Sequence, residues 1–288
     1  MTNTAVLLTC YNRKPMTDRC LETLTKAMQA DPAAAYDVYL VDDASTDGTA
    51  ALVRDKYPEV HLIHGTGSLF WAGGMRLAWQ TALKEDKTYD GFLLINDDVE
   101  FEDSFWKDMT FTHQYCLRQY GQEGLYVSSL RDKETGQHTY GGHILKKRIF
   151  KHQTLPVLPA ADRPVPCQLS NANILYVPAK VIKRIGTLDE RFTHSLADFD
   201  YTLSAGEQNI PLLLCPNYGG FCSGGDRDQL PQLPTLRSRM QHLYGVKGIA
   251  LNEYLYYLRK HFPWKAPYAF AALWAEALFP FTKRKNSR

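Results

Sequence analysis

The sequence predicts an α/β protein with a mostly parallel sheet flanked by helices and a helical extension at the C-terminus. Three observations support this prediction: short apolar runs alternate with helical patterns in the first hundred residues, polar residues follow three of these runs, and residues 231–288 are basic and rich in aromatic side chains. Strands and helices that alternate in this way are typical of parallel sheets with right-handed crossovers. We therefore expect a sheet domain over residues 1–230 and an extension over 231–288.

The expected elements follow one another closely along the chain. The expected strands are residues 5–9, 36–41, 60–63, 92–95, 127–129 and 168–177, and the expected helices are residues 18–28, 50–56, 75–83 and most of 234–288. Thr17 or Asp18 is expected to cap the first helix. Residues 141–143 and 156–166 indicate loops. The strand at 92–95 is the centre of this pattern, because its continuous apolar run indicates burial on both faces, as in a parallel sheet.

Composition and charge exclude several classes of protein. The 288 residues are 44% hydrophobic and 22% charged with a net charge of +2, which is ordinary for a globular protein and predicts no nucleic-acid partner. Residues 231–288 hold ten Lys or Arg against two Asp or Glu, so the basic excess lies at one end. The six cysteines form no C-x-x-C pair, which favours reduced thiols in the cytoplasm over a zinc site. We find no signal peptide and no run of about 20 apolar residues that could span a membrane.

Polar loops follow three of the expected strands, at residues 9–13, 42–47 and 96–98. The carboxyl ends of parallel strands lie along one edge of a sheet, where ligands of α/β proteins bind. Oxygen ligands without His or Cys suit Mg²⁺ or Mn²⁺, which combine a few carboxylates with substrate phosphates. Each loop alone could be an acidic surface turn, but the three together indicate a site for a nucleoside diphosphate and a divalent cation.

The same loops carry sequence motifs. T-C-Y-N-R at 9–13, V-D-D-A-S-T-D-G-T at 41–49 and L-L-I-N-D-D at 93–98 resemble family 2 glycosyltransferases of the GT-A fold. F-W-A-G-G-M-R at 70–76 resembles the rhamnosyltransferase-like branch of that family. The resemblance runs from about residue 5 to residue 222. It implies an inverting transferase that moves a sugar from a UDP- or dTDP-sugar to a hydroxyl of a saccharide or lipid-linked acceptor in surface polysaccharide synthesis.

The resemblance also implies roles for individual residues. The expected donor-binding residues are Thr9, Tyr11, Arg13, Asp42, Asp43, Gly74, Asn96 and Asp97. Asn96 and Asp98 occupy the outer positions of a D-x-D signature, so Asp98 is the expected ligand of Mg²⁺ or Mn²⁺, with a neutral amide in place of the first carboxylate. Asp198 is the expected general base, and Ala197 stands where Glu is usual. We expect Asp200 to be structural and His194 to be a loop residue.

Two further expectations come from the resemblance. Asn173 is either close to the donor sugar or simply a turn residue. Many relatives have a metal-contacting His near residues 216–223, which this chain lacks, and we do not assign that role to Cys222.

Several alternatives remain open. The basic end either covers the sheet domain or makes peripheral contact with an anionic membrane, at the inner face of the cytoplasmic membrane; dimerisation through residues 254–258 is a third reading. A catalytically silent scaffold that binds nucleotide sugars would explain Asn96 and Ala197 at usually acidic positions. A sugar nucleotidyltransferase would need a glycine-rich basic loop after the first strand. A dinucleotide site is weaker still, because Phe70 replaces the third glycine of G-x-G-x-x-G.

Overall fold

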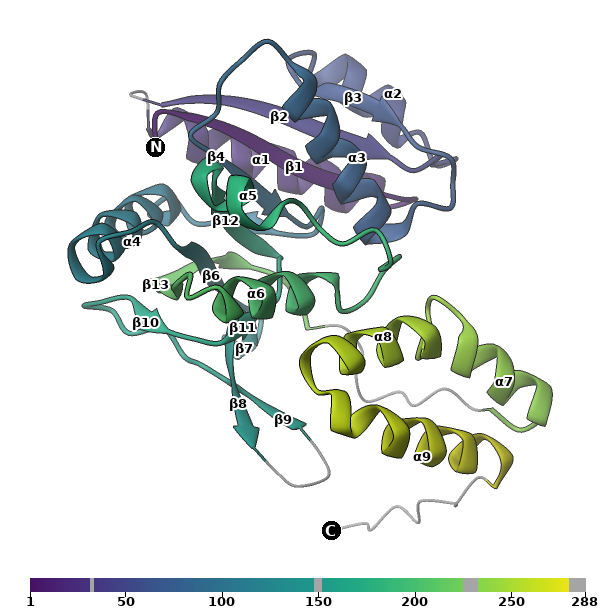
Figure 1. Cartoon of the computed structure of the whole chain (residues 1–288). Helices are drawn as coiled ribbons and strands as arrows, with labels where there is room; N and C mark the ends of the chain where they lie inside the picture. Colours follow the sequence, from purple (N-terminus) through teal and green to yellow (C-terminus); the bar gives the residue numbers. More distant parts are fainter. Residues whose placement is uncertain (32–33, 148–151, 225–232, 280–288) are drawn as a thin grey trace.

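The computed structural model describes residues 1–31, 34–147, 152–224 and 233–279 (Figure 1). Its main sheet has the strand order β10-β13-β6-β12-β4-β1-β2-β3, with β5 paired to β13 and β7 to β6, and a smaller sheet has the order β11-β8-β9. The strands are β1 (Asn3–Cys10), β2 (Ala35–Asp42), β3 (His61–His64), β4 (Gly91–Ile95), β5 (Glu100–Phe101), β6 (Leu125–Arg131), β7 (His138–Tyr140), β8 (Gly142–Lys147), β9 (His152–Pro156), β10 (Val165–Pro166), β11 (Leu169–Ser170), β12 (Ile174–Pro178) and β13 (Leu212–Phe221). The helices are α1 (Lys14–Gln29), α2 (Thr49–Lys56), α3 (Phe70–Lys84), α4 (Phe105–Tyr120), α5 (Ala179–Ile185), α6 (Ala197–Glu207), α7 (Leu236–Tyr244), α8 (Leu251–His261), the 3₁₀ turn η1 (Pro263–Lys265) and α9 (Ala266–Leu278).

The N-terminal half of the sheet is parallel, as expected. Leu7 of β1 pairs with Tyr39 of β2 on one side and with Leu94 of β4 on the other, in parallel registers. On its far side, however, β4 pairs with the antiparallel strand β12. The expectation that residues 92–95 lie in a parallel sheet is therefore right for one neighbour and wrong for the other, and the sheet is mixed beyond β4.

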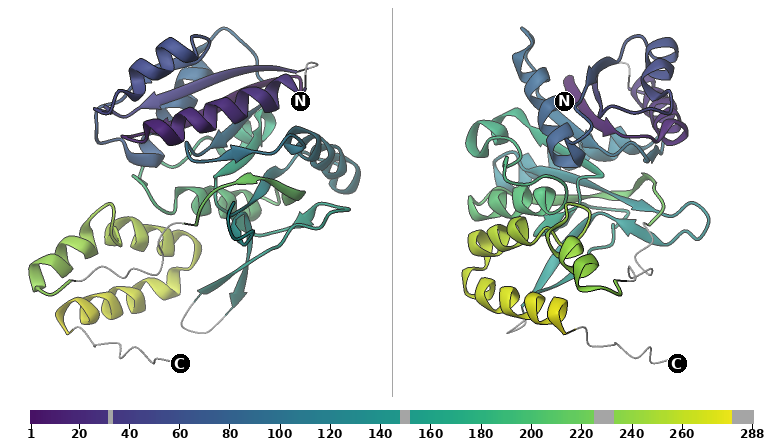
Figure 2. Two further views of the ribbon diagram at one scale, coloured as in Figure 1. Left: turned by 180° about the vertical axis from the view of Figure 1, so that it is seen from behind. Right: turned by 90° about the vertical axis from the view of Figure 1, so that its right-hand side faces the viewer.

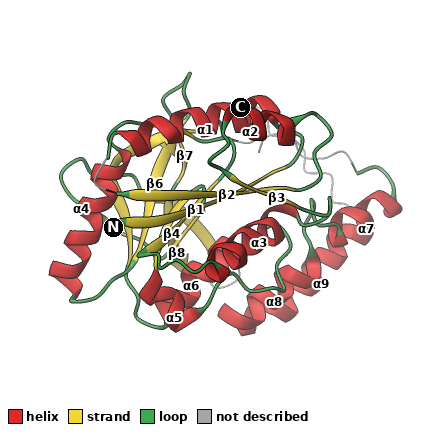
Figure 3. Ribbon diagram, turned by 90° about the horizontal axis from the view of Figure 1, so that it is seen from above, coloured by secondary structure: helices red, strands yellow, loops and turns green. Residues whose placement is uncertain are grey.

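Helices cover both faces of the sheet (Figure 3). On one face Leu24 of α1, Val53 of α2 and Met109 of α4 belong to one buried core cluster. On the other face α3, α5 and α6 contribute Met75, Val181 and Tyr201 to a second cluster. All five residues of β4 are buried between these two cores, which explains why the run at 92–95 is apolar without interruption.

Helix α3 begins at Phe70, five residues before its expected start. The glycine-rich stretch therefore forms the first turns of a helix and not a loop. Gly74 in this stretch permits a close approach to β1, because a Cβ atom there would lie 2.3 Å from the Oγ1 atom of Thr9. Any larger side chain would push the helix away from the strand.

Helix α1 also begins earlier than expected, at Lys14, and its N-cap Arg13 makes no side-chain capping bond. The expected caps are therefore wrong. Pro15 lies in the first turn, where its missing N–H costs no hydrogen bond. Thr17 is instead buried beside Asp97, and Asp18 pairs with Lys56.

Two later predictions need correction. The expected strand at 168–177 is interrupted, because β11 ends at Ser170 and β12 begins at Ile174. Strand β8 begins at Gly142, where a loop was expected, and pairs with β11 and β9. Helix α5 then separates β12 from α6.

Among the C-terminal helices, α8 packs beside α6, and α7 and α9 pack on α8, further from the main sheet (Figures 1 and 2). Tyr257 and Leu258 of α8 are buried in the second core cluster. The reading in which residues 254–258 form a dimer contact stays a prediction, and it is limited to Tyr254 and Tyr256, which are only partly buried. In the described part of the chain, no helix combines the length and the apolar character needed to cross a bilayer. The basic residues 283–288 lie outside the described residues.

Candidate active site

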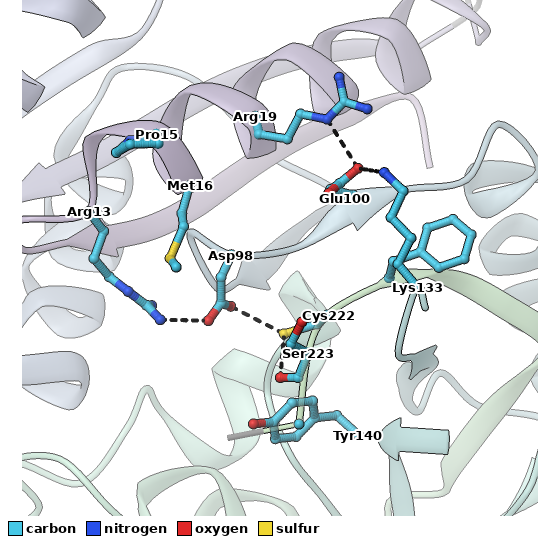
Figure 4. Close-up of a pocket in the computed structure, with 12 residues that line it drawn as sticks. Arg13, Pro15, Met16, Arg19, Asp98, Glu100, Lys133, Tyr140, Cys222 and Ser223 are labelled. Atoms are coloured by element: carbon cyan, nitrogen blue, oxygen red, sulfur yellow. Dashed lines mark hydrogen bonds and ion pairs between the residues drawn. The ribbon is translucent and has the colours of Figure 1, made fainter. Parts of the chain in front are cut away.

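Two cavities open at the carboxyl ends of β1, β2 and β4, and Arg13 lines both. The first cavity, of about 530 Å³, is lined by Thr9, Cys10, Tyr11, Arg13, Asp43, Gly67, Phe70, Trp71, Asp97, His194 and Lys247. The second cavity, of about 660 Å³ (Figure 4), is lined by Arg13, Pro15, Met16, Arg19, Asp98, Glu100, Lys133, Tyr140, Phe221, Cys222, Ser223 and Gly224. Both volumes fall in the usual range for small-molecule sites, about 300–1,000 Å³.

Arg13 holds two adjacent carboxylates at the boundary between the cavities. Its Nη1 atom lies 2.7 Å from Oδ1 of Asp97, and its Nη2 atom lies 2.9 Å from Oδ2 of Asp98. Asp97 is only 3% exposed, and burial raises the pKa of its carboxyl to about 6 although the Arg13 guanidinium opposes the shift. The guanidinium is therefore what allows Asp97 to be ionised in this position.

Asp98 is the more accessible of the two acids. Its side chain is 24% exposed, against 4% for Asp97. Its second oxygen, Oδ1, accepts a hydrogen bond from the thiol of Cys222 at 3.4 Å (Figure 4). Burial and the nearby Asp98 carboxylate raise the pKa of the Cys222 thiol, so the thiol is protonated and donates. Asp98 is consequently the carboxylate that a ligand can reach from the second cavity.

Asn96 is held by an aromatic residue that lines the first cavity. The indole N–H of Trp71 donates to Oδ1 of Asn96 at 2.8 Å. The amide oxygen that replaces the first carboxylate of the D-x-D signature thus already has a donor. Asn96 itself lies outside the described linings of both cavities. Its side chain therefore affects the first cavity only indirectly, by holding the indole of Trp71 in place.

The chain's fit to a divalent cation depends on Asp98. Within the described residues, no group of three or more His, Cys, Asp or Glu side chains is arranged to hold a metal ion. Mg²⁺ commonly binds through one or two carboxylates, with phosphate oxygens and water completing its shell. The partly exposed Asp98 beside Asp97 fits such a partial site and would have to exchange its bond to Arg13 for one to the cation.

The adjacent acids Asp42 and Asp43 face different surroundings. Asp43 lines the first cavity and accepts hydrogen bonds from the backbone N–H groups of Gly67, Leu69 and Phe70 at 2.7, 2.9 and 3.1 Å. Asp42 is 2% exposed and accepts from the backbone N–H of Ser45 at 3.0 Å. Asp43 thus shapes the cavity at the start of α3, whereas Asp42 stabilises the turn that follows β2.

Of the remaining donor-site candidates, two line the first cavity and one does not. Thr9 lines the first cavity, where its hydroxyl donates to the carbonyl of Val41 at 3.2 Å, and Tyr11 lies at the edge with 49% of its surface exposed. Gly74 lies outside the described linings, and its Cα faces Thr9. Gly74 therefore acts on the cavity through the packing of α3 against β1.

Asp198 and Asp200 lie in the first turn of α6 and differ in their partners. Oδ1 of Asp198 accepts from the backbone N–H of Phe199 at 2.8 Å, and Oδ2 accepts from that of Ala172 at 3.3 Å. Burial raises the pKa of the Asp198 carboxyl to about 6. Asp200, 2% exposed, binds the side chains of Lys260 and His261 on α8, both at 2.8 Å, so it joins the catalytic-candidate helix to the C-terminal helices.

Asp198 lies outside the described linings of both cavities but is connected to the end of β4. The segment that bonds to Asp198 continues into Asn173, whose carbonyl accepts from the backbone N–H of Asn96 at 3.1 Å. Asn173 is 6% exposed. Two backbone hydrogen bonds thus link the Asp198 carboxylate, through residues 172 and 173, to Asn96 at the end of β4.

Sequence reasoning missed Lys247, which lines the first cavity from the connection between α7 and α8. His194 lines the same cavity, and burial and the nearby Lys247 lower the pKa of its imidazole. Arg13 is paired with two carboxylates, whereas Lys247 makes no ion pair with any described residue. The basic excess of residues 231–288 was the available signal, but the sequence does not tell which of its cations turns toward the sheet.

Comparisons with known proteins agree with this geometry. The family model described as Glycosyl transferase family 2 matches residues 5–114, which confirms the resemblance over that segment. The solved structure of the mannosyltransferase PcManGT from Pyrobaculum calidifontis, in complex with GDP-Man and Mn²⁺, is 15% identical, with 97% of this chain and 76% of that chain covered and a TM-score of 0.51. S. aureus TarS 1–349 is 14% identical, with 96% and 79% covered and a TM-score of 0.54. The expected GT-A fold is thereby confirmed. No curated protein matched the sequence.

Proposed function

We propose that the protein is an inverting glycosyltransferase that transfers a sugar from a nucleoside diphosphate donor to a hydroxyl of a saccharide or lipid-linked acceptor, in the assembly of a surface polysaccharide. The match to family 2 over residues 5–114 supports glycosyl transfer. The main structural support is that residues following β1, β2 and β4 line one cavity of about 530 Å³ beside the Asp97–Asp98 pair. A rhamnosyl donor is proposed on the sequence of residues 70–76 alone.

In this proposal the first cavity holds the nucleoside diphosphate. Tyr11, Phe70 and Trp71 offer aromatic surfaces for the base, and Thr9 and Asp43 offer polar atoms for the base or ribose. The diphosphate would lie toward Arg13 and Lys247. Because Arg13 is already paired with two carboxylates, Lys247 is, among the described cations that line this cavity, the one left to balance the charge of the phosphates.

Asp98 would hold Mg²⁺ or Mn²⁺ at the boundary of the two cavities. The bound cation would supply positive charge that stabilises the departing nucleoside diphosphate. The Mn²⁺ ion in the PcManGT complex supports this choice of metal class. Asp97 keeps Arg13 in place, so that the guanidinium remains close to the phosphates when Asp98 turns to the cation.

Asp198 is proposed as the general base. As the acceptor oxygen forms its bond to the anomeric carbon and the bond from that carbon to the phosphate oxygen breaks, the acceptor proton passes to the Asp198 carboxylate. A general base works best when its pKa is close to the working pH, and burial raises the pKa of Asp198 to about 6. A single displacement at the anomeric carbon inverts its configuration, which is why we propose an inverting enzyme.

Calorimetric titration of UDP, dTDP and GDP, with and without Mn²⁺, tests the donor site. The proposal requires that one nucleotide binds to the wild type with Mn²⁺, and that Asp98→Ala removes the metal-dependent part of the affinity. Asp198→Ala should keep that binding and lose transfer from the matching nucleotide sugar. Binding without turnover in the wild type, across saccharide acceptors, would favour the silent scaffold. Absence of binding to all three nucleotides would contradict the donor site itself.

A further inference from the structure

The outer surface of α9 and of the turn before it is unusually apolar. Fifteen large hydrophobic side chains of the described residues are exposed, and five of them fall within residues 264–279. They are Trp264, Tyr268, Phe270, Leu278 and Phe279, which are 60%, 50%, 45%, 44% and 68% exposed. We call these five residues the α9 surface. A group of exposed apolar side chains of this kind on a solvent-facing surface usually marks an interaction site.

The inner side of α9 is already occupied by the other C-terminal helices. Leu273, Trp274 and Ala277 pack in a cluster with Leu243 of α7 and Leu255 of α8. Glu276 is the single charged residue of the helix. A helix that is apolar on both its inner and its outer side is normally buried or in contact with lipid, and the outer side of α9 carries the exposed rings and side chains of the α9 surface.

The charge around the α9 surface favours an anionic partner. A groove of about 340 Å³ between α8 and α9 is lined by Leu255, Arg259, Pro263, Ala266, Pro267 and Phe270, so a cation and an exposed ring share one depression. Arg259 makes no ion pair with a described residue. In sequence, α9 is followed closely by Lys283, Arg284, Lys285 and Arg288 without an intervening acidic residue.

A second element ends on the same side of the molecule. The hairpin of β8 and β9 extends away from the main sheet toward the side on which α9 lies (Figures 1 and 2). Ile144 on β8 is 42% exposed, and Lys146 beside it is also exposed. Apolar and basic side chains therefore occur on two separate elements that share one side.

These observations decide between the partners that an apolar face can have. A second copy of the chain would bring one basic segment against another, because residues 231–288 carry a balance of +8 in each copy, and like charges across an interface oppose association. An anionic bilayer instead attracts Lys and Arg while its acyl region accepts aromatic and aliphatic groups. At 13 residues, α9 is about 20 Å long, too short to cross about 30 Å of hydrocarbon, so it would lie along the interface.

We infer that the α9 surface binds the protein to an anionic lipid bilayer, with α9 lying in the plane of the interface and the β8–β9 hairpin on the same side. This inference goes beyond the proposed transfer reaction and does not depend on it, because lipid binding requires neither donor nor acceptor. It would hold the two cavities close to a membrane on which lipid-linked acceptors are carried.

Vesicle co-sedimentation of the full chain tests the inference. The expected result is binding to vesicles of phosphatidylcholine mixed with phosphatidylglycerol, weak binding to phosphatidylcholine alone, and loss of binding as salt is raised, because the charge attraction is screened. The variant Phe270→Ser with Leu278→Ser removes two residues that are 45% and 44% exposed. We expect it to weaken partitioning to the mixed vesicles by about tenfold or more.

A matched control variant is available on the sheet domain. Leu83 on α3 and Leu117 on α4 are 49% and 40% exposed, so Leu83→Ser with Leu117→Ser removes a similar apolar surface from two other helices. We expect this control to bind vesicles as the wild type does, and both variants to retain nucleotide binding, which separates a failure of this inference from a failure of the proposed function.

Three outcomes would overturn the inference. One is equal binding of the wild type to both kinds of vesicle, or to neither. Another is equal loss of binding in the α9 variant and the control. A third is a concentration-dependent dimer in sedimentation velocity without lipid that the α9 variant abolishes, which would assign the α9 surface to self-association.

Discussion

Replacing Asp198 by Asn should abolish the proposed sugar transfer while stabilising the fold at neutral pH. Burial raises the pKa of this carboxyl from 3.8 to about 6. Between these two values the folded chain binds more protons than the unfolded chain, so stability falls as pH rises through this range. A shift of about two pKa units corresponds to about 3 kcal/mol once both states are ionised.

The Asn side chain carries no charge, so it avoids this cost at every pH. Between pH 5 and pH 8 the stability of Asp198→Asn relative to the wild type should therefore rise by about 1.4 kcal/mol. The amide keeps one acceptor for the backbone N–H groups of Phe199 and Ala172, and the loss of the other bond adds a constant penalty of about 1 kcal/mol that does not vary with pH. The slope with pH, and not the absolute value, is thus the diagnostic quantity.

Urea denaturation at a series of pH values measures this slope, and a transfer assay at pH 8 measures activity. Asp200→Asn is the control, because it lies two residues away but removes a carboxylate bound to Lys260 and His261. We expect that control to lose about 2 kcal/mol at neutral pH. If Asp198→Asn shows no increase in relative stability between pH 5 and pH 8, the carboxyl is not desolvated and the reasoning for a tuned base fails. Full activity in this variant would equally remove Asp198 from the mechanism.

Three further predictions concern the cavity walls. Gly74→Ala should lower the free energy of unfolding by about 1–3 kcal/mol, because its Cβ would lie 2.3 Å from Oγ1 of Thr9. Thermal melts measure this loss, and Gly73→Ala, whose Cβ would meet its nearest atom at 3.3 Å, should be tolerated. Equal losses of stability in the two variants would contradict the packing role of Gly74. Lys247→Ala should weaken calorimetric binding of the nucleoside diphosphate about tenfold and flatten its salt dependence, whereas unchanged binding would place the phosphates elsewhere. Arg13→Gln leaves the buried Asp97 unpaired and should lower the free energy of unfolding by about 3 kcal/mol at pH 8. The loss should be smaller at pH 5, because Asp97 with its raised pKa then takes up a proton. A loss of stability in urea titrations that does not vary with pH would refute this.

The resemblance to a transferase family came from short motifs at the ends of strands, and the family match to residues 5–114 covers the same segment. These motifs are readable in sequence because each combines a buried apolar strand with the polar residues that directly follow it. The prediction that Thr9, Arg13, Asp43 and Asp97 come together is of this kind, and all four line the first cavity. Adjacent acids were harder to separate, since nothing local indicates that Asp43 lines the cavity while Asp42 is turned to Ser45.

The sequence by itself determined the α/β class, the positions of the first four strands along the chain, the polar loops that follow three of them and the helical, basic C-terminus. Each of these depends on the spacing of residues close together in the chain. Only the tertiary structure decided the antiparallel insertion of β12 beside β4, the bond between Trp71 and Asn96 and the arrival of Lys247 in the first cavity. It also decided which side of the C-terminal helices is left exposed. These features depend on contacts between residues 25 to more than 200 positions apart, and such contacts form only when the whole fold has fixed which faces are buried.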